Sequence, residues 1–270
     1  MLESLKDGAL IIEVHMKLVD PTEPPARFIP ENPFACEAIR CMFMDDDSAD
    51  VVIEVKGRNF HVHRFVVQKC STILADADLL IQLSNVSPDI FRHLLYMYGG
   101  KIEDAKMKLH PKEIIDAADL YGVVNLKLDA EVRFVEATIF TMENVLDHLE
   151  YAESMNLALL IETAMKFIVE NKIEAPNTLS FKDAPKRIVN DLLVTFATGE
   201  GNSNNELNRM PVDELRRDCL LQRLDFEGSR DALIAALKNK QRSSLGEFVS
   251  SLGSHIISLL LDKLLTSHYK

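Results

Sequence analysis

Two histidines and a cysteine come closest to a metal-ligand set in this sequence. His61 and His63 lie two residues apart on an expected strand, so both rings would point to the same face, and Cys70 follows them. A structural zinc site takes four ligands, and no fourth ligand stands at a usable spacing. The pattern therefore favours a structural role for these side chains over a metal site.

The sequence offers no set of nucleophile, base and orienting group. Ser71 is not framed by the Gly-x-Ser-x-Gly turn that exposes a nucleophilic serine, and no glycine-rich phosphate loop precedes a helix. The run Asp45-Asp46-Asp47 lacks the glycine and glutamate spacing of a calcium loop. We therefore expect no enzymatic activity, no metal and no cofactor.

A basic segment near the C-terminus is the clearest candidate for binding a ligand. Residues 209–242 hold eight Lys/Arg and six Asp/Glu, a net charge of +2, whereas the rest of the chain carries −14. Ser229 and Arg230 follow a glycine at an expected helix start, where backbone N–H groups attract phosphate. With Arg216 and Arg217 on the expected polar side of the preceding helix, they predict a weak, salt-dependent nucleic-acid contact. The alternative is a helical pair that docks on protein, because four acidic residues crowd the same surface.

Bulk composition limits the class of partner. The 270 residues carry a net charge of −12, with 47% apolar residues and four cysteines. The acidic balance excludes binding of nucleic acid or anionic membranes by bulk electrostatics. Irregularly spaced cysteines without a signal peptide indicate reduced thiols, and no apolar run reaches the roughly 20 residues of a membrane span. We therefore expect an intracellular protein of the nucleus, the cytoplasm or both, with no membrane partner.

The elements expected between residues 48 and 102 form a compact series. Two alternating runs, 50–55 and 60–63, are separated by Lys56-Gly57-Arg58-Asn59 and predict a β-hairpin. A short helix from Arg64 to Lys69 and a third strand at residues 81–83 follow. Ser87 can cap the next helix, and its apolar face repeats at i, i+3, i+4 and i+7 through Phe91, Leu94, Leu95 and Tyr98.

This series resembles the BTB/POZ family almost element by element. The matching residues are Asp50-Val51, Phe60-x-Val62-His63-Arg64-x-Val66-Val67, Ser71, Ile81-x-Leu83 and Val86-Ser87-Pro88-x-x-Phe91-x-x-Leu94-Leu95-x-x-Tyr98-x-Gly100-x-Ile102. The resemblance implies an α+β fold, mostly helical, in which a helical cluster packs on a small mixed sheet. It also implies that Asp50 is a buried, hydrogen-bonded anchor and that His63-Arg64 brace the strand-to-helix corner. The family associates proteins and performs no chemistry of its own.

Two further segments precede the BTB/POZ-like domain, which we assign to residues 34–130. Residues 1–20 predict a lone strand, and the phrase Asp7-Gly8-x-Leu10-x-Ile12-Glu13-Val14 resembles the closing strand of a MATH domain. The alternative is a strand added to the BTB sheet or to a partner's sheet. Five prolines between residues 21 and 33 predict an extended linker.

The remainder of the chain predicts helices. Residues 131–198 resemble a BACK-type extension, with a generic helical repeat as the alternative, and residues 199–208 predict a linker. Residues 209–242 resemble a SAP motif, a helix-turn-helix piece used on DNA or chromatin. An apolar helix is expected within residues 243–270.

The resemblances together imply an adaptor of the MATH-BTB type. It would form a homodimer through the N-terminal strand and the helix at residues 34–43, and recruit client proteins to a cullin-3 ubiquitin ligase. The family carries a hydrophobic-x-Glu cullin contact after the Ser71 position, and Leu74, Asp76 and Asp78 are the candidates in this chain. The alternative is a BTB-dimerised chromatin- or DNA-associated regulator that uses the SAP-like motif.

Overall fold

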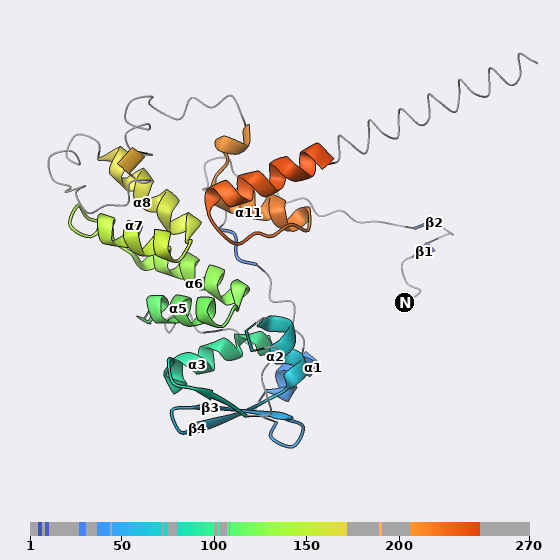
Figure 1. The fold of residues 1–270 in the computed structure, drawn as a ribbon. Helices are drawn as coiled ribbons and strands as arrows, with labels where there is room; N and C mark the ends of the chain where they lie inside the picture. The colour runs from blue at the N-terminus through green and yellow to red at the C-terminus, as the bar shows by residue number, and fades with distance from the viewer. Residues whose placement is uncertain are drawn as a thin grey trace, which may run out of the picture.

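The fold is α+β and mostly helical, with a small mixed sheet at one end (Figure 1). The structure is a computed structural model, and it describes residues 5–6, 9–10, 27–30, 37–43, 45–71, 73–74, 80–99, 102, 107, 109–171, 189–190 and 206–243. Helices stack away from the sheet in chain order, and the C-terminal helices lie beside the last of them. None of the described helices combines the length and hydropathy needed to cross a membrane.

The three-stranded sheet confirms the expected strands. β3 (Val51–Val55) pairs antiparallel with β4 (Arg58–Val62) and parallel with β5 (Leu80–Leu83). Lys56 and Gly57 both take positive φ, 49° and 80°, which is typical of a two-residue hairpin turn. The turn is therefore shorter than expected, and Arg58 and Asn59 belong to the strand.

Four short helical pieces cover the sheet. They are α1 (Glu37–Met42), α2 (Arg64–Cys70), α3 (Pro88–Leu94) and the 3-10 helix η1 (Leu95–Tyr98). Ser87 caps α3 as expected, since its Oγ accepts the N–H of Ile90 at 3.2 Å. Gly99 ends η1 with a φ of 75°. The single helix expected from Ser87 to Gly99 is thus an α-helix that tightens into a 3-10 turn.

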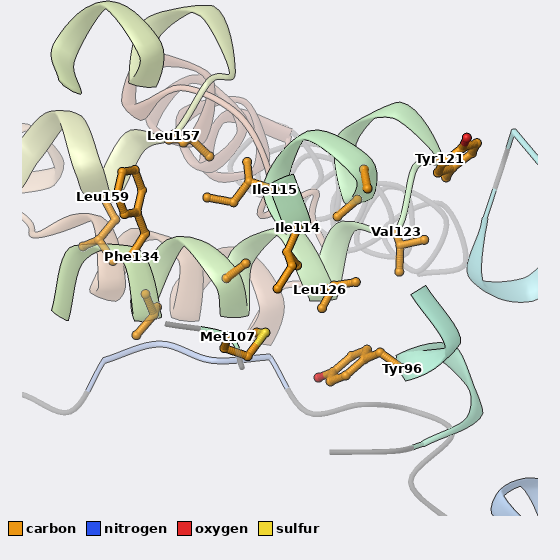
Figure 2. Close-up of a cluster of buried hydrophobic side chains, with 14 of the residues drawn as sticks. Tyr96, Met107, Ile114, Ile115, Tyr121, Val123, Leu126, Phe134, Leu157 and Leu159 are labelled. Atoms are coloured by element: carbon orange, nitrogen blue, oxygen red, sulfur yellow. The ribbon is translucent and has the colours of Figure 1, made fainter. Parts of the chain in front are cut away.

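Two antiparallel helical pairs continue the core. They consist of α5 (Pro111–Leu120), α6 (Val124–Ala137), α7 (Val145–Ser154) and α8 (Ala158–Glu170). Figure 2 shows the side chains of Ile114, Leu126, Phe134 and Leu157 gathering between these helices. Burying a large apolar side chain contributes about 1.5–3 kcal/mol, so this cluster stabilises the junction between the sheet region and the helices.

The C-terminal helical pair consists of α11 (Val212–Leu221) and a helix over residues 230–243, preceded by the 3-10 helix η2 (Glu206–Asn208). Its buried residues Leu215, Leu233 and Leu237 belong to the same apolar cluster as the sheet region. Leu207 is also buried there, so the linker expected at 199–208 is wrong at its C-terminal end. Residues 199–205 of that linker and 244–270 of the expected last helix lie outside the described residues.

The N-terminal segments also differ from expectation. β1 (Leu5–Lys6) pairs antiparallel with β2 (Ala9–Leu10), so these residues form a hairpin rather than a lone strand. Residues 11–20 lie outside the described part. Within the expected linker, Phe28 and Pro30 are buried, and Arg27 and Phe28 contact the C-terminal helical pair.

Candidate functional site

The corner between β4 and α2 is held by Asp50. Its Oδ1 accepts the backbone N–H of Arg64 at 2.7 Å, which satisfies a donor in the first turn of α2. The residue is hydrogen-bonded as expected but exposed, so its expected burial is wrong. The reason is its position: a side chain that caps a surface helix lies at the surface.

His63 is buried and engaged at both ring nitrogens. Nδ1 lies 3.1 Å from the Tyr98 hydroxyl oxygen and Nε2 lies 2.8 Å from Ser48 Oγ, while the His63 backbone N–H donates to the Tyr98 hydroxyl at 2.6 Å. Burial raises the pKa of Tyr98 to about 12. These contacts make His63 a polar brace. No group of three His, Cys, Asp or Glu side chains in the described ranges could hold a metal ion.

Ser71 closes the turn after α2 and buries Leu74. The Ser71 hydroxyl donates to the backbone carbonyl of Tyr121 and accepts the N–H of Leu74 at 3.0 Å. Leu74 is therefore 4% exposed inside the core, and the prediction that it forms an accessible cullin contact is wrong. Among the described residues of this turn, Ile73 is exposed, at 60%. Asp76 and Asp78 lie outside the described residues.

The aromatic residues of the BTB-like series fill the core. Phe91 is fully buried, with its ring centroid 4.9 Å from that of Phe60. Tyr98 is buried, and its ring centroid lies 5.6 Å from that of Phe43. Phe60, Phe91 and Tyr98 therefore support the fold from the inside and are not part of the protein surface.

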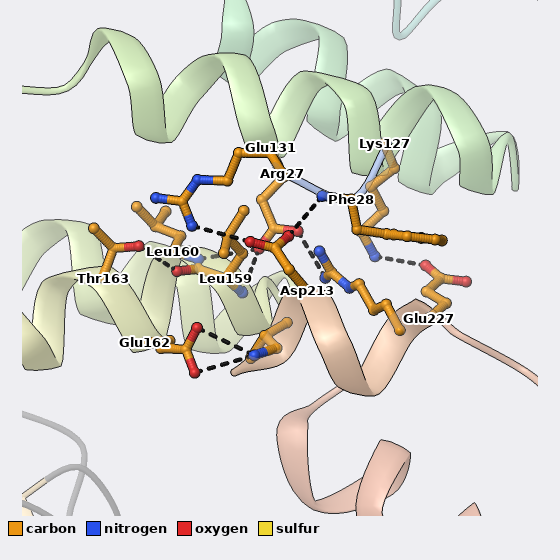
Figure 3. Close-up of polar contacts among 12 residues, drawn as sticks. Arg27, Phe28, Lys127, Glu131, Leu159, Leu160, Glu162, Thr163, Asp213 and Glu227 are labelled. Atoms are coloured by element: carbon orange, nitrogen blue, oxygen red, sulfur yellow. Dashed lines mark hydrogen bonds and ion pairs between the residues drawn. The ribbon is translucent and has the colours of Figure 1, made fainter. Parts of the chain in front are cut away.

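Glu131 of α6 joins α8 to the C-terminal helical pair (Figure 3). Its Oε1 accepts the N–H groups of Leu159 and Leu160, at 2.8 and 3.1 Å, in the first turn of α8. Its Oε2 lies 2.7 Å from Nη2 of Arg216, and both side chains are 0% exposed. The expected polar-side position of Arg216, and with it the proposed phosphate contact, is therefore wrong.

The sequence held a signal for this burial. Val212, Leu215, Arg216 and Cys219 follow the spacing i, i+3, i+4, i+7, so Arg216 belongs to the apolar face of α11. A charged residue on an apolar face requires a buried partner, and Glu131 supplies it.

Arg230 also serves an internal contact. Its Nη1 lies 2.8 Å from Glu162 Oε1, and its Nη2 donates to the carbonyl oxygens of Asn208 and Met210 at 3.1 and 2.6 Å. The Glu162 carboxylate also accepts the N–H of Val212 at 3.1 Å, which caps α11. Burial raises the pKa of Glu162, while the Val212 N–H and Arg230 oppose that rise.

Ser229 and Arg217 complete the predicted phosphate set. Ser229 Oγ accepts the N–H of Ala232 at 3.3 Å and so caps the helix over residues 230–243. Arg217 is partly buried on α11. The structure thus assigns Arg216, Ser229 and Arg230 to contacts within the chain. Nucleic-acid binding by this segment stays a prediction.

Lys127 is a junction residue that the sequence did not indicate. Its ammonium lies 2.5 Å from Asp119 Oδ1, and its side chain is 4% exposed. The ammonium also lies 2.8 Å from Glu227 Oε1, the contact drawn in Figure 3. Together with the Glu131–Arg216 and Glu162–Arg230 pairs, it forms what we call the charged junction between α5, α6 and α8 and the C-terminal helical pair.

Comparisons with known proteins place one domain on this chain. The family model "BTB/POZ domain" matches residues 42–138. The curated protein "Kelch repeat and BTB domain-containing protein 4" of Homo sapiens is 28% identical over 155 residues, which cover 54% of this chain and 28% of the relative. The protein of the same name from Pongo abelii is 27% identical over 155 residues, which cover 54% and 29%. The chain thus spans less than a third of the length of these relatives.

Two solved structures resemble part of the chain. The BTB domain of zebrafish PATZ1 is 19% identical with a TM-score of 0.31, covering 36% of this chain and 86% of that one. The BTB domain of human gigaxonin is 20% identical with a TM-score of 0.31, covering 44% and 97%. The MATH, BACK and SAP resemblances stay predictions.

Proposed function

We propose that this chain, which carries a BTB/POZ domain over residues 42–138, is an adaptor that binds other proteins and catalyses no reaction. The match to the BTB/POZ model is the observation that carries the proposal. BTB/POZ domains are protein–protein interaction modules, and the matched aromatic and polar residues serve the fold of this one. The surface around them is therefore the functional part.

The first element of the proposal is a homodimer formed through the first helices. Ile39 and Met42 of α1 pack against the core, which leaves Ala38 exposed. Phe43, directly after α1, contacts the Tyr98 ring and is still 37% exposed. Phe65 of α2 is 57% exposed. Exposed aromatic residues on neighbouring elements are typical of a surface that a second protein covers. A stable interface needs about 800 Å² from each partner, so α1 would have to be joined by further segments.

Sedimentation of the full chain at micromolar concentration tests the dimer. We expect twice the mass of one chain for the wild type and the mass of one chain for Ala38→Glu, which places a charge on the outer side of α1. Ala235→Glu is the matched control, because Ala235 is an exposed alanine in the helix over residues 230–243. A wild-type monomer would overturn this element.

The second element is recruitment of a cullin-3 ubiquitin ligase in the cytoplasm or nucleus. The burial of Leu74 moves the candidate contact to Ile73, whose exposed side chain stands on the turn that Ser71 closes. An exposed β-branched residue on a hydrogen-bonded turn offers a rigid apolar contact at low entropic cost.

Retention of purified cullin-3 by the tagged full chain tests recruitment. We expect the wild type and Ile139→Asp to retain cullin-3 and Ile73→Asp to lose it. Ile139 is a matched control because it is 82% exposed and lies in the segment between α6 and α7. A wild type that does not retain cullin-3 would remove the ligase from the proposal and leave the self-associating adaptor.

A further inference from the structure

Residues 27–30 lie across the C-terminal helical pair, although 186 positions separate Arg27 from Asp213 of α11. One carboxylate holds this segment. Asp213 Oδ2 pairs with Nη1 of Arg27 at 3.1 Å, and Asp213 Oδ1 accepts the backbone N–H of Phe28 at 2.9 Å (Figure 3). A single side chain therefore recognises both the charge and the backbone of the segment.

The side chains of the segment alternate between buried and exposed. Phe28 is 6% exposed, and its ring packs edge-on against Phe226 with centroids 5.9 Å apart. Pro30 is buried, whereas Ile29 is exposed. An extended peptide bound to a protein surface likewise places every second side chain against its receptor, and those side chains determine specificity.

With the segment in place, Arg27 and the Phe28 N–H satisfy the Asp213 carboxylate. Its side chain is only 5% exposed, and a buried carboxylate is costly unless donors and a cation satisfy it. The charge of the site thus selects a basic residue directly before the aromatic one.

We propose that the C-terminal helical pair is a receptor for linear peptides of the form Arg-Phe-x-Pro, and that residues 27–30 occupy it as an internal ligand. The occupant in trans is such a segment of a partner protein. A tethered ligand competes at an effective concentration in the millimolar range, so the internal segment sets the threshold that a partner peptide must exceed.

The test uses a fluorescein-labelled peptide with the sequence of residues 23–33 and the full-length chain. Fluorescence anisotropy should show binding to the variant Arg27→Ala plus Phe28→Ala at least about tenfold tighter than to the wild type, because the internal competitor is weakened. Adding Asp213→Asn to that variant should weaken binding about tenfold, since the charge-assisted contacts are lost. The peptide in which alanine replaces its phenylalanine should not bind.

Ile29→Ala is the matched control. Its side chain is exposed, so the variant should bind the peptide as weakly as the wild type does. Arg27→Ala alone provides a milder opening in case the double variant does not fold, because the Arg27 side chain is 39% exposed and Phe28 remains in place. It should bind with an affinity between those of the wild type and the double variant.

Two results would overturn the proposal. One is no binding by a folded, opened variant at about 1 mM peptide, which would make the segment a fixed structural strap. The other is a wild-type oligomer that the peptide splits into monomers, which would assign the site to the segment of a second copy instead.

Discussion

The corner between β4 and α2 and the charged junction are held together by different interactions. At the corner between β4 and α2, the buried polar contacts involve a hydroxyl, an imidazole and backbone groups, with Asp50 exposed at the edge. At the junction, ionised groups are buried: Glu131 and Arg216 are fully enclosed, and Lys127 is almost so. The first region depends on apolar packing and on hydrogen bonds between uncharged groups, and the second on pairing between buried charges.

Because of this difference, the two regions should tolerate substitutions to different degrees. Removing one partner of a buried hydrogen bond between uncharged groups lowers the free energy of unfolding modestly. Removing one partner of a buried ion pair lowers it strongly, because a charge is then left buried and unpaired. The stability of the junction should therefore respond to single substitutions and to pH more strongly than that of the corner between β4 and α2.

The largest effect is expected for Glu131→Ala. It leaves the Arg216 guanidinium buried without a carboxylate and two N–H groups of α8 without an acceptor, so the free energy of unfolding should fall by about 3–5 kcal/mol. Urea denaturation followed by circular dichroism measures the loss.

A double variant separates charge from packing at the same position. Nε and Nη1 of Arg216 have no hydrogen-bond partner in the described part of the chain, so the wild-type pair is incompletely satisfied. Glu131→Gln combined with Arg216→Met should therefore restore most of the stability. A double variant as unstable as Glu131→Ala would show that the junction depends on shape rather than charge.

A smaller loss of stability is expected for Tyr98→Phe at the corner between β4 and α2. It removes the hydroxyl that accepts the His63 N–H and leaves a buried donor unsatisfied, which should cost about 1–3 kcal/mol. Tyr151→Phe is the matched control, since its hydroxyl donates to the carboxylate of Asp116 at an exposed contact. Equal losses in the two variants would contradict the importance of the His63 contact.

Alkaline pH should weaken the junction through Lys127. Burial lowers the pKa of this ammonium, but the hydrogen bonds to Asp119 and Glu227 and their charges outweigh it, so the pKa is raised above 10.5. The folded state then holds the proton more tightly than the unfolded state. The stabilisation by Lys127 is complete below about pH 10.5 and is lost as the pH rises through the folded-state pKa.

Comparison with Lys127→Met isolates this effect from the tyrosines that titrate in the same range. The difference in melting temperature between the wild type and the variant should shrink as the pH rises above 10.5. The change should be smaller than that for Tyr98→Phe, because Asp119 and Glu227 are partly exposed. A difference that stays constant with pH would contradict the assignment.

The smallest effect is expected for Lys166→Ala on the outer side of α8. Lys166 and Glu170 approach to 3.9 Å with side chains 75% and 62% exposed, so the pair should contribute less than about 0.5 kcal/mol. Thermal unfolding should be almost unchanged. A loss comparable to that of Glu131→Ala would remove the contrast between buried and exposed pairs.

The sequence predicted the fold of the BTB/POZ region well, because its information is local. Alternation in β3 and β4, the Ser87 cap and the apolar spacing from Phe91 to Tyr98 each specify an element within a few residues. The position of Leu74 was not predictable in this way, because it depends on Ser71 bonding to a carbonyl 50 positions later.

The candidate site was predicted poorly at the C-terminal helical pair. Charge and helix-turn-helix spacing favoured a phosphate surface, but Arg216 and Arg230 pair with Glu131 and Glu162 from distant helices. The spacing of Arg216 indicates its burial, but no local pattern indicates which distant carboxylate neutralises it. The same limit concealed the contact of Phe28 with Phe226, because a proline-rich stretch predicts an extended chain and not its docking position.

The docking of Arg27 and Phe28 has a consequence for protein synthesis. Their partner Asp213 is translated 186 and 185 positions later, which at about 5–20 residues per second is an interval of roughly 10–40 seconds. During that time Phe28 has left the ribosome without the surface that buries it. Arg27 and Phe28 are thus open to chaperones for this interval, and they reach their final position only after the C-terminal helices have emerged.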